Sequence, residues 1–357
     1  MPLKNVVRTR EEAAALDLPP LVVLEPLERF LDQHGLGSGQ LSARPIGEGH
    51  SNVTYLLERG GERFVLRRPP RPPLPPSAHD VLREARLLRA LEGTPVRVPR
   101  VLAVCEDESV LGVPFYVMNF VEGTVVTSEL PPALDVPEQR RRLGEQLIDA
   151  LVEIHQVDWR AVGLEGFAKP TGYLERQLRR FTALWEHNKT RELPVVVEVG
   201  RWLAANMPET PRTTIVHGDY RLGNVMVANN PPARIIAIFD WEMSTLGDPL
   251  ADLGYLTITW SEPGDPETMF SALSAITRRE GFPSRRELVE RYAAKTGTDV
   301  GDLRWYQALA LWKAAVFMEG NYKRLLAGTT DDPFLRMFDR GVPQLAEAAL
   351  ELTRQHA

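Results

Sequence analysis

The spacing of apolar residues predicts strands early in the chain and mostly helices later. Short apolar runs bounded by glycine or proline predict strands over 53–57, 63–66, 101–104 and 113–118, with Gly60-Gly61 as the turn between the first two. Helical spacing predicts a leading helix over 24–31. A second predicted helix begins after a capping box at 77–80 and runs to Leu91. Helical spacing returns over 143–154, and a strand pair follows near 225 and 235.

This order predicts an α+β fold of two lobes. We expect a small, mainly β N-terminal lobe with one helix over 1–118, a hinge at 119–123, and a larger, mainly helical lobe over 124–357. A chain of 357 residues is also long enough to form two lobes. The prolines of segment 69–76 forbid a strand there and favour a stiff link; a proline-rich docking motif is the other interpretation.

Composition and charge exclude several classes of function. A net charge of −6, without a basic run interleaved with aromatics, gives no attraction to nucleic acid. Cys105 is the only cysteine, so an intrachain disulfide is impossible. No N-terminal segment has the pattern of a signal peptide, and no apolar run is long enough to cross a bilayer. We therefore expect a cytoplasmic protein with no nucleic-acid or membrane partner; the oligomeric state is left open.

The residues that indicate chemistry lie in 216–225 and 235–242. Asp219 is followed five residues later by Asn224, and Asp240 ends an apolar strand. Phosphoryl transfer from a magnesium nucleotide needs one carboxylate to orient and deprotonate an alcohol, and an amide oxygen with a second carboxylate to hold the metal. The order and spacing match a kinase catalytic loop, with His-Gly-Asp in place of His-Arg-Asp. Asp219 is the predicted catalytic base, and Asn224 and Asp240 are the predicted Mg²⁺ ligands.

Each of these residues also has an ordinary structural explanation. Asp219 could cap a turn, Asn224 could occupy a bend, and Asp240 could end a buried strand. We interpret His217 as a brace that bonds nearby backbone, and Arg221 as a salt-bridge partner. Asp248 and Asp252 could contact substrate or metal, but capping of a helix by Asp248, just before a proline, is favoured.

A second set of residues predicts a nucleotide site. Gly47 and Gly49 would let backbone amides approach phosphates, Ser51 adds a hydroxyl, and Asn52 stands where the third glycine of a Gly-x-Gly-x-x-Gly loop would lie. A plain hairpin turn explains the two glycines as well.

Three further positions extend this set. Arg67 ends a strand where a kinase carries its phosphate-contacting lysine, and Arg68 beside it leaves the assignment open. Glu84 falls on the apolar stripe of the helix, so it should face inward and pair with a cation, for which Arg67 is the best candidate. Asn119 to Val121 are hinge candidates for adenine, although a plain core strand would have the same sequence.

These motifs together resemble the aminoglycoside phosphotransferase and choline kinase-like family, a relative of protein kinases. Further segments, such as Gly172-Tyr-Leu-Glu-Arg-Gln177 and Ser244-Thr-Leu-Gly-Asp-Pro249, are similar to the kinase-like domains fused to acyl-CoA dehydrogenases and their free-standing bacterial relatives. The resemblance covers residues 20 to 330. It implies a protein-kinase-like fold, ATP and Mg²⁺ as cofactors, Asp219 as base, Asn224 and Asp240 on magnesium, and an Arg67–Glu84 pair on the phosphate side. Arg67 in place of lysine departs from the family pattern.

The expected activity is transfer of the γ-phosphate of ATP to a hydroxyl of a small molecule. By resemblance the acceptor is a hydroxyacyl group, such as a hydroxyacyl-CoA, with an aminoglycoside ranked below it. The acidic residues Glu262, Asp265 and Glu267 could serve a polycationic sugar, although a solvated loop explains them too. The phosphates of CoA would need cations, for which the candidates on helix faces are Arg176, Arg179, Arg180 and Arg201, or Lys313, Lys323 and Arg324. The alternative function is a catalytically inactive kinase-like module that binds a nucleotide or another ligand.

Overall fold

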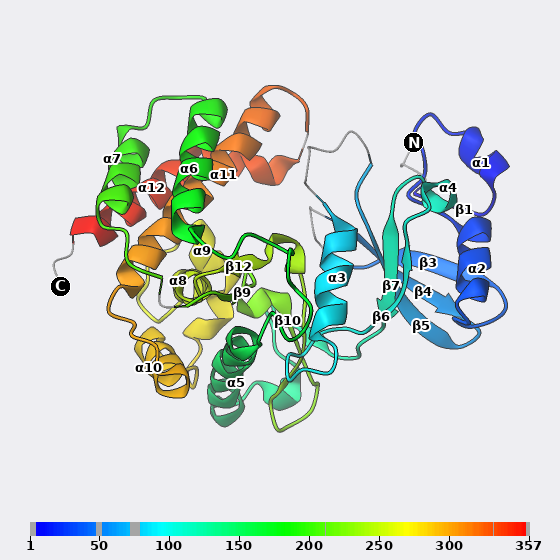
Figure 1. Cartoon of the computed structure of the whole chain (residues 1–357), viewed down its shortest axis with the longest axis horizontal. Helices are drawn as coiled ribbons and strands as arrows, with labels where there is room; N and C mark the ends of the chain where they lie inside the picture. The colour runs from blue at the N-terminus through cyan, green and yellow to red at the C-terminus, as the bar shows by residue number, and fades with distance from the viewer. Residues whose placement is uncertain (1–4, 48–51, 72–78, 211, 331, 355–357) are drawn as a thin grey trace. The chain divides into compact units, whose positions relative to one another are not determined.

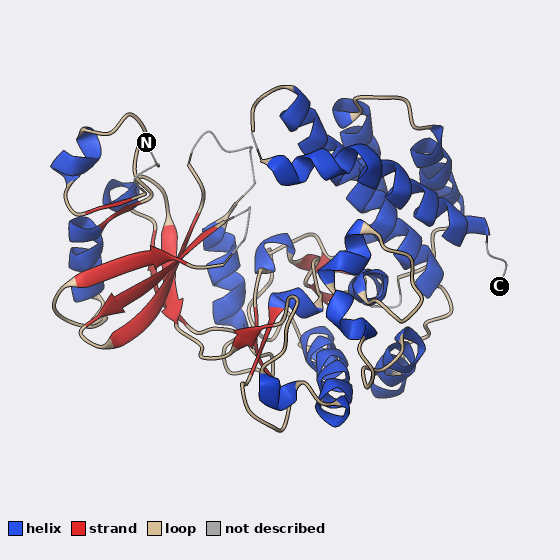
Figure 2. Cartoon of the chain, turned by 180° about the vertical axis from the view of Figure 1, so that it is seen from behind, coloured by secondary structure: helices blue, strands red, loops and turns tan. Residues whose placement is uncertain are grey.

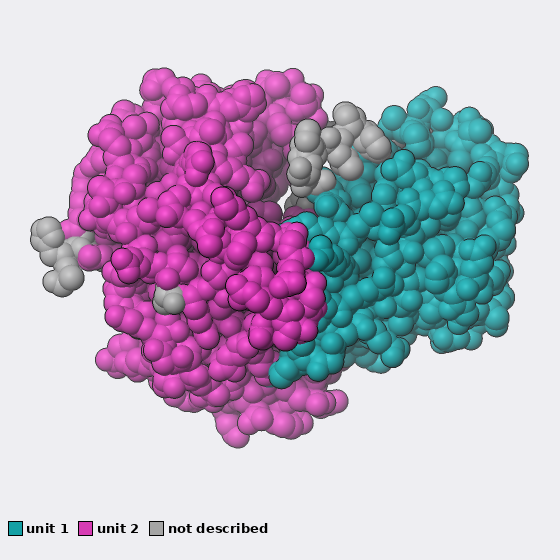
Figure 3. Space-filling model, viewed as in Figure 1, with its two compact units in different colours: residues 1–122 teal, residues 123–357 magenta. Residues whose placement is uncertain are grey.

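The chain divides into two units, residues 1–122 and 123–357 (Figure 3). The structure is a computed structural model and describes residues 5–47, 52–71, 79–210, 212–330 and 332–354. The division falls at the end of the segment 119–123. Strands gather in the first unit and helices dominate the second (Figure 2), which confirms the predicted two-lobed α+β fold.

Unit 1 is built on a five-stranded antiparallel sheet with the strand order β3-β4-β5-β7-β6 (Figure 1). Its strands are β3 (Leu41–Pro45), β4 (Val53–Arg59), β5 (Glu62–Arg68), β6 (Val101–Cys105) and β7 (Phe115–Asn119). Gly60 and Gly61 connect β4 to β5 with positive φ angles of 57° and 84°. Two left-handed residues are what a tight two-residue hairpin requires, so the predicted turn is confirmed.

Within its described residues, unit 1 contains more helices than the lobe of one helix that we expected, and two of them lie where helical spacing predicts them, over 24–31 and up to Leu91. The helices are α1 (Arg10–Ala14), α2 (Leu24–Gln33), α3 (Val81–Leu91) and α4 (Glu108–Leu111), beside a two-stranded parallel ladder of β1 (Val6–Val7) and β2 (Val22–Val23). The short helices α1 and α4 lack an apolar stripe long enough to be recognised by periodicity. Asp80 caps α3 by accepting the Arg83 N–H at 2.9 Å; Ser77, the other end of the predicted capping box, lies outside the described residues.

The sheet of unit 1 holds its hydrophobic core against α2. Inward-facing side chains of the strands, such as Tyr55, Leu57 and Leu66, pack with Leu27 and Leu31 of this helix, and all five are nearly fully buried. Alternate residues of these strands thus contribute to this core, as the period of two along a strand requires.

Unit 2 combines two small sheets with many helices. One sheet has the order β11-β10-β8 and the other pairs β12 with β9; the strands are β8 (Thr124–Val125), β9 (Thr214–Val216), β10 (Val225–Val227), β11 (Ile235–Ile238) and β12 (Thr245–Gly247). The α-helices are α5 (Pro137–Gln156), α6 (Tyr173–Asn188), α7 (Pro194–Ala205), α8 (Leu250–Thr259), α9 (Met269–Leu273), α10 (Arg285–Thr296), α11 (Leu303–Leu326) and α12 (Phe338–Arg354). Single 3₁₀ turns are η1 (Pro132–Leu134), η2 (Leu222–Asn224), η3 (Trp241–Met243), η4 (Ala275–Arg278) and η5 (Pro333–Met337).

Helix α11 is the central helix of unit 2. It packs against α6, α7, α8 and α12, so apolar residues surround most of its circumference (Figure 1). Within the described ranges, none of the helices combines the length and the apolar character that crossing a membrane requires.

Candidate active site

The loop after β9 carries the predicted base. The buried carboxylate of Asp252 fixes the start of this loop. Asp252 of α8 accepts the backbone N–H groups of His217 and Gly218, at 2.7 and 2.8 Å. Gly218 has φ = 89°, and a Cβ there would lie 2.8 Å from the carbonyl oxygen of Met243. Only glycine fits this conformation without strain. The loop that leads to Asp219 therefore has a fixed path.

Asp252 is fully buried and ionised in this setting. Burial by itself would raise its pKa, but the hydrogen bond and charge of His155 and the N–H of Gly218 hold the pKa of Asp252 below its ordinary value. His155 in turn bonds the hydroxyl of Tyr292 at 2.7 Å. Asp252 thus positions the loop rather than contacting substrate or metal. By contrast, the predicted capping role of Asp248 is confirmed, because its Oδ1 accepts the Leu250 N–H at 3.0 Å.

His217 is a structural brace, as predicted. Its Nε2 lies 2.9 Å from the carbonyl oxygen of Phe239, and its Nδ1 lies 3.3 Å from the N–H of Asp219. A carbonyl can only accept and an N–H can only donate, so Nε2 carries the proton and Nδ1 is the acceptor. His217 thereby ties the start of the catalytic loop to the residue before Asp240.

Asp219 and Asn224 are in direct contact. The Asn224 amide nitrogen donates to the carboxylate oxygen Oδ2 and to the backbone carbonyl of Asp219, both at 2.7 Å. Both amide protons are therefore used on Asp219, and the Oδ1 atom of Asn224 is the one suited to a metal ion. Arg221 lies on the other side of Asp219, with Nε 3.5 Å from Oδ1, which confirms the expected salt bridge.

Tyr255 of α8 is a neighbour of Asp219 that the sequence analysis missed. The negative charge of the Asp219 carboxylate acts on its hydroxyl. Burial first, and then the negative charges of Asp219 and Asp240, raise the pKa of Tyr255 well above its ordinary value. Both carboxylates therefore act on one hydroxyl, and this tyrosine remains a protonated donor at neutral pH.

Asp240 follows β11 at a strained bend. Its backbone is left-handed, with φ = 64° and ψ = 56°, which is uncommon for a residue other than glycine and is typical of functional positions. The preceding residue, Phe239, donates its N–H to the carbonyl of Asn224 at 2.9 Å. The backbone thus places Asp240 beside Asn224, as the predicted metal site requires.

The donor chemistry of Asn224 and Asp240 fits Mg²⁺. Both offer hard oxygen donors, and magnesium in nucleotide sites takes few protein ligands and completes its shell with phosphates and water. Across the described ranges no three His, Cys, Asp or Glu residues form a cluster of the kind that would hold a metal on its own. A two-residue site that depends on the nucleotide is consistent with that finding.

Unit 1 contains the predicted ion pair. Arg67 Nε lies 3.0 Å from Glu84 Oε2, and Arg67 Nη1 donates to Thr54 at 3.3 Å. The Glu84 side chain is only 2% exposed, so the inference that it faces inward and needs a cation is confirmed. Arg68 points away from this pair, donating to the backbone carbonyls of Pro69 and Leu21, and its burial lowers its pKa to about 10. Arg67 is therefore the arginine that pairs with Glu84, and its contact with phosphate stays a prediction.

The expected phosphate loop is described only at its two ends. Gly49 and Ser51 lie outside the described residues, while Gly47 has φ = 79°, a conformation suited to glycine. Asn52 is 3% exposed, and its Oδ1 lies 3.2 Å from Nδ1 of His79. Its side chain thus joins the end of the loop to the start of α3. The contacts of these residues with nucleotide stay a prediction.

The hinge candidates have different structural roles. Asn119 ends β7, and its Oδ1 accepts the Arg100 N–H at 2.6 Å. Its side chain and its backbone N–H, which donates to the Arg100 carbonyl at 3.0 Å, are therefore both used at this end of the sheet. Val121 is partly buried in a segment without helix or strand. Their contact with adenine likewise stays a prediction.

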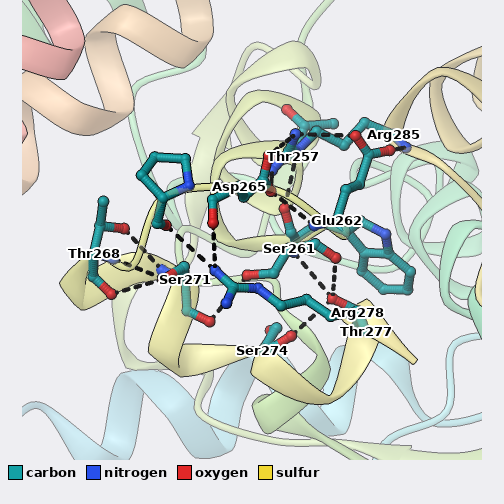
Figure 4. A network of polar contacts seen from close by, with 12 residues as sticks. Thr257, Ser261, Glu262, Asp265, Thr268, Ser271, Ser274, Thr277, Arg278 and Arg285 are labelled. Carbon is teal, nitrogen blue, oxygen red and sulfur yellow. Dashed lines mark hydrogen bonds and ion pairs between the residues drawn. The ribbon is translucent and has the colours of Figure 1, made fainter.

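The acidic segment between Trp260 and Phe270 is more ordered than the solvated loop expected from sequence. Arg285 Nη1 lies 3.1 Å from Glu262 Oε2, and the same guanidinium also pairs with Asp265 (Figure 4). Burial by itself would raise the pKa of Asp265, but the contacts with Arg285 lower it, and the net result is a pKa below the ordinary value. Two of the three acids are thus neutralised by one arginine, whereas Glu267 is exposed.

Comparison with known proteins assigns the chain to a family. Residues 42–309 match the profile of the phosphotransferase enzyme family, and the chain belongs to that family. A solved structure of a putative aminoglycoside phosphotransferase from Ralstonia eutropha is 32% identical, covers 92% of this chain and 98% of its own, and superposes with a TM-score of 0.80. Hence the predicted kinase-like fold and family are confirmed.

Relatives among curated proteins are of two kinds. Acyl-CoA dehydrogenase family member 10 of Mus musculus is 31% identical over 97% of this chain, and family member 11 of Gallus gallus is 34% identical over 89%. The matched region spans only 32% and 41% of those two proteins. Thiamine kinase of Escherichia coli is 25% identical over 90% of this chain and 94% of its own length.

Proposed function

We propose that the protein is a Mg²⁺- and ATP-dependent phosphotransferase that acts on a hydroxyl group of a small molecule. The observation that carries this proposal is the contact of Asn224 with Asp219, beside the strained Asp240. A structural explanation of these residues accounts for each one singly, but not for a carboxylate, an amide and a second carboxylate gathered on one loop and strand end. Family membership supports the same activity.

The roles of the chain's residues follow from their chemistry. Arg67, held by Glu84, would contact nucleotide phosphates. The Asn224 Oδ1 atom and Asp240 would hold a magnesium ion, which would supply positive charge to the phosphates. Asp219 accepts a hydrogen bond from the acceptor hydroxyl and orients it. The acceptor oxygen forms a bond to the γ-phosphorus, the bond from that phosphorus to the bridging oxygen of ADP breaks, and the hydroxyl proton passes to the Asp219 carboxylate.

For the acceptor we propose a hydroxyacyl thioester such as a hydroxyacyl-CoA. The support is the similarity to proteins named as acyl-CoA dehydrogenase family members. An aminoglycoside is the second candidate, because solved neighbours include a phosphotransferase crystallised with AMP-PNP and hygromycin B; at 17% identity that neighbour is evidence for the fold alone. The pairing of Glu262 and Asp265 with Arg285 weakens this candidate, because a polycationic sugar needs unpaired carboxylates.

A comparison of acceptors tests the proposal. ADP release is measured with 4-hydroxybutyryl-CoA and with kanamycin, for the native chain and for Asp219→Asn. We expect turnover with the thioester that the variant lacks. Turnover with kanamycin alone would reverse the order of acceptors. Binding of ATP without phosphate transfer to either acceptor or to water would instead favour an inactive nucleotide-binding module.

A further inference from the structure

Two cations of unit 2 meet at one aromatic ring, outside the residues assigned above. Lys313 of α11 places its ammonium 4.9 Å from the centre of the Phe181 ring, and the guanidinium carbon of Arg180 lies 6.0 Å from the same centre. Phe181 is buried on α6, whereas Arg180 is exposed and Lys313 is partly buried. Both cations therefore lie along the contact of α6 with α11 (Figure 1).

The charges of these two cations are not neutralised by a carboxylate of the described residues. In that part of the chain, neither Lys313 nor Arg180 has a carboxylate at ion-pair distance. Burial and the charge of Arg180 lower the pKa of Lys313 to about 8, against a smaller opposing effect of Asp252. Asp252 already accepts from His155 and from two backbone N–H groups, so its charge is satisfied elsewhere. A partly buried ammonium beside a second cation is unfavourable unless an anion binds there.

The helices that carry Lys313 and Arg180 contact elements that support the loop before Asp219, because α11 packs against α8 and α6 against β12. Asp252, whose charge acts on Lys313, holds the loop residues His217 and Gly218 directly before Asp219. At the start of α6, the ring of Tyr173 packs against Gly247, where a Cβ would lie 2.6 Å from it. The α6–α11 contact thus adjoins the strand and helix that support the catalytic loop.

Two other candidate cations of these helices are already engaged, and two more, Arg179 and Arg324, are exposed. Arg176 donates to the backbone carbonyls of Lys169 and Thr171. Lys323, also on α11, donates to the carbonyl of His187 at 2.5 Å. Among the cations on α6 and α11 that sequence alone offers for an anionic acceptor, the structure therefore favours Lys313 and Arg180.

We propose that Lys313, assisted by Arg180, binds an oxyanion of the phosphate acceptor and selects acceptors that carry a negative charge. This inference rests on the proposed function and adds the residues that recognise the charge of the acceptor. A carboxylate of a free hydroxy acid and a phosphate of a CoA ester present the same chemistry to an ammonium and a guanidinium. The acceptor series below separates these two sources.

Three related acceptors provide the test: butane-1,4-diol, which is neutral, 4-hydroxybutyrate, which carries a carboxylate, and 4-hydroxybutyryl-CoA, which carries phosphates. Dissociation constants of the two anions are measured by calorimetry, and KM and kcat for all three by ADP release. In Lys313→Met we expect the dissociation constant and KM of at least one anion to rise about tenfold or more. The KM for the neutral diol and the affinity for ATP should stay unchanged.

Matched variants identify the cause of such a change. Lys313→Arg should retain anion binding, because the charge remains. Lys323→Met removes a lysine of the same helix and should leave every constant unchanged. Between pH 7 and pH 9 the KM for the anionic acceptor should rise in the native protein, as Lys313 loses its proton, and change less in Lys313→Arg. The charged groups acting on Lys313 are Arg180 and Asp252.

The possible outcomes distinguish this inference from the proposed function. Loss of anion binding in Lys313→Met, with no phosphate transfer by the native protein, would support the binding site and contradict the enzyme. Equal anion constants in the native protein and Lys313→Met would overturn the inference while the enzyme could stand. The inference would also be overturned if neither anion binds the native protein, or if Lys313→Met lowers only the affinity for ATP.

Discussion

Asn224 uses both protons of its side-chain amide on Asp219, one on the carboxylate and one on the backbone carbonyl, each at 2.7 Å. Asn224 therefore has two tasks in the proposed mechanism. Its nitrogen fixes the base, and its oxygen is available to the metal.

Replacement of Asn224 by aspartate separates these tasks. Aspartate is a good magnesium ligand, but it removes both donors and places a second negative charge against Asp219. We expect kcat to fall about 100-fold or more, because the electrostatic and positioning roles are lost together. Steady-state kinetics measure this, with Asn206→Asp, at the C-cap that follows α7, as a control that should leave kcat unchanged. A fully active Asn224→Asp enzyme would show that the amide does not position the base.

Asp219 and Asp240 should differ in their effects on nucleotide binding. Asp219→Asn should remove most turnover and leave the affinity for Mg-ATP nearly intact, because Asp219 faces the acceptor in the proposed mechanism. Asp240→Asn should weaken both Mg-ATP binding and rate, because it removes a metal ligand. Calorimetric titration with Mg-ATP, beside kinetics, checks the division. Equal losses of affinity in the two variants would contradict it.

Tyr255 should contribute to rate and not to folding. Tyr255→Phe keeps the ring that packs near Phe270, with centroids 6.1 Å apart, and removes the hydroxyl on which the charge of Asp219 acts. We expect this hydroxyl to donate to Asp219 during turnover; a hydrogen bond to a charged group contributes about 1.5–3 kcal/mol, so kcat should fall about tenfold or more. The melting temperature should change little. Tyr322→Phe, which removes an exposed hydroxyl bonded to Asp339, should leave the rate unchanged.

Gly218 should tolerate no side chain. Alanine at φ = 89° would be strained, and its Cβ would meet the Met243 carbonyl oxygen at 2.8 Å. We expect Gly218→Ala to lower the free energy of unfolding by about 2 kcal/mol and to displace the catalytic loop. Thermal denaturation and kcat measure the two effects. Gly264→Ala is a comparison with similarly positive φ but open space, so it isolates the backbone strain from the clash.

The sequence is informative where partners are close along the chain or where periodicity assigns a face. Asp219 and Asn224 are five residues apart, and the inward stripe of α3 predicts that Glu84 needs Arg67. The positions of Asp252 and Tyr255 beside this loop could not be predicted in this way, because only the packing of α8 brings them to residues more than thirty positions earlier in the chain. Arg285 likewise lies 23 residues after Glu262, and no local pattern predicts that it neutralises the acidic segment.

Lys313 should make stability depend on pH in the alkaline range. Its folded pKa is about 8, below the ordinary value of 10.5, so the unfolded chain binds more protons between these values. Stability therefore rises with pH from about 8 to about 10.5, by at most about 3 kcal/mol from this group. Other groups titrate there too, so the measurement is the difference in unfolding free energy between the native protein and Lys313→Met. This difference should shift in favour of the native protein as pH rises from 7 to 10, and a constant difference would show that Lys313 is fully solvated in the folded state.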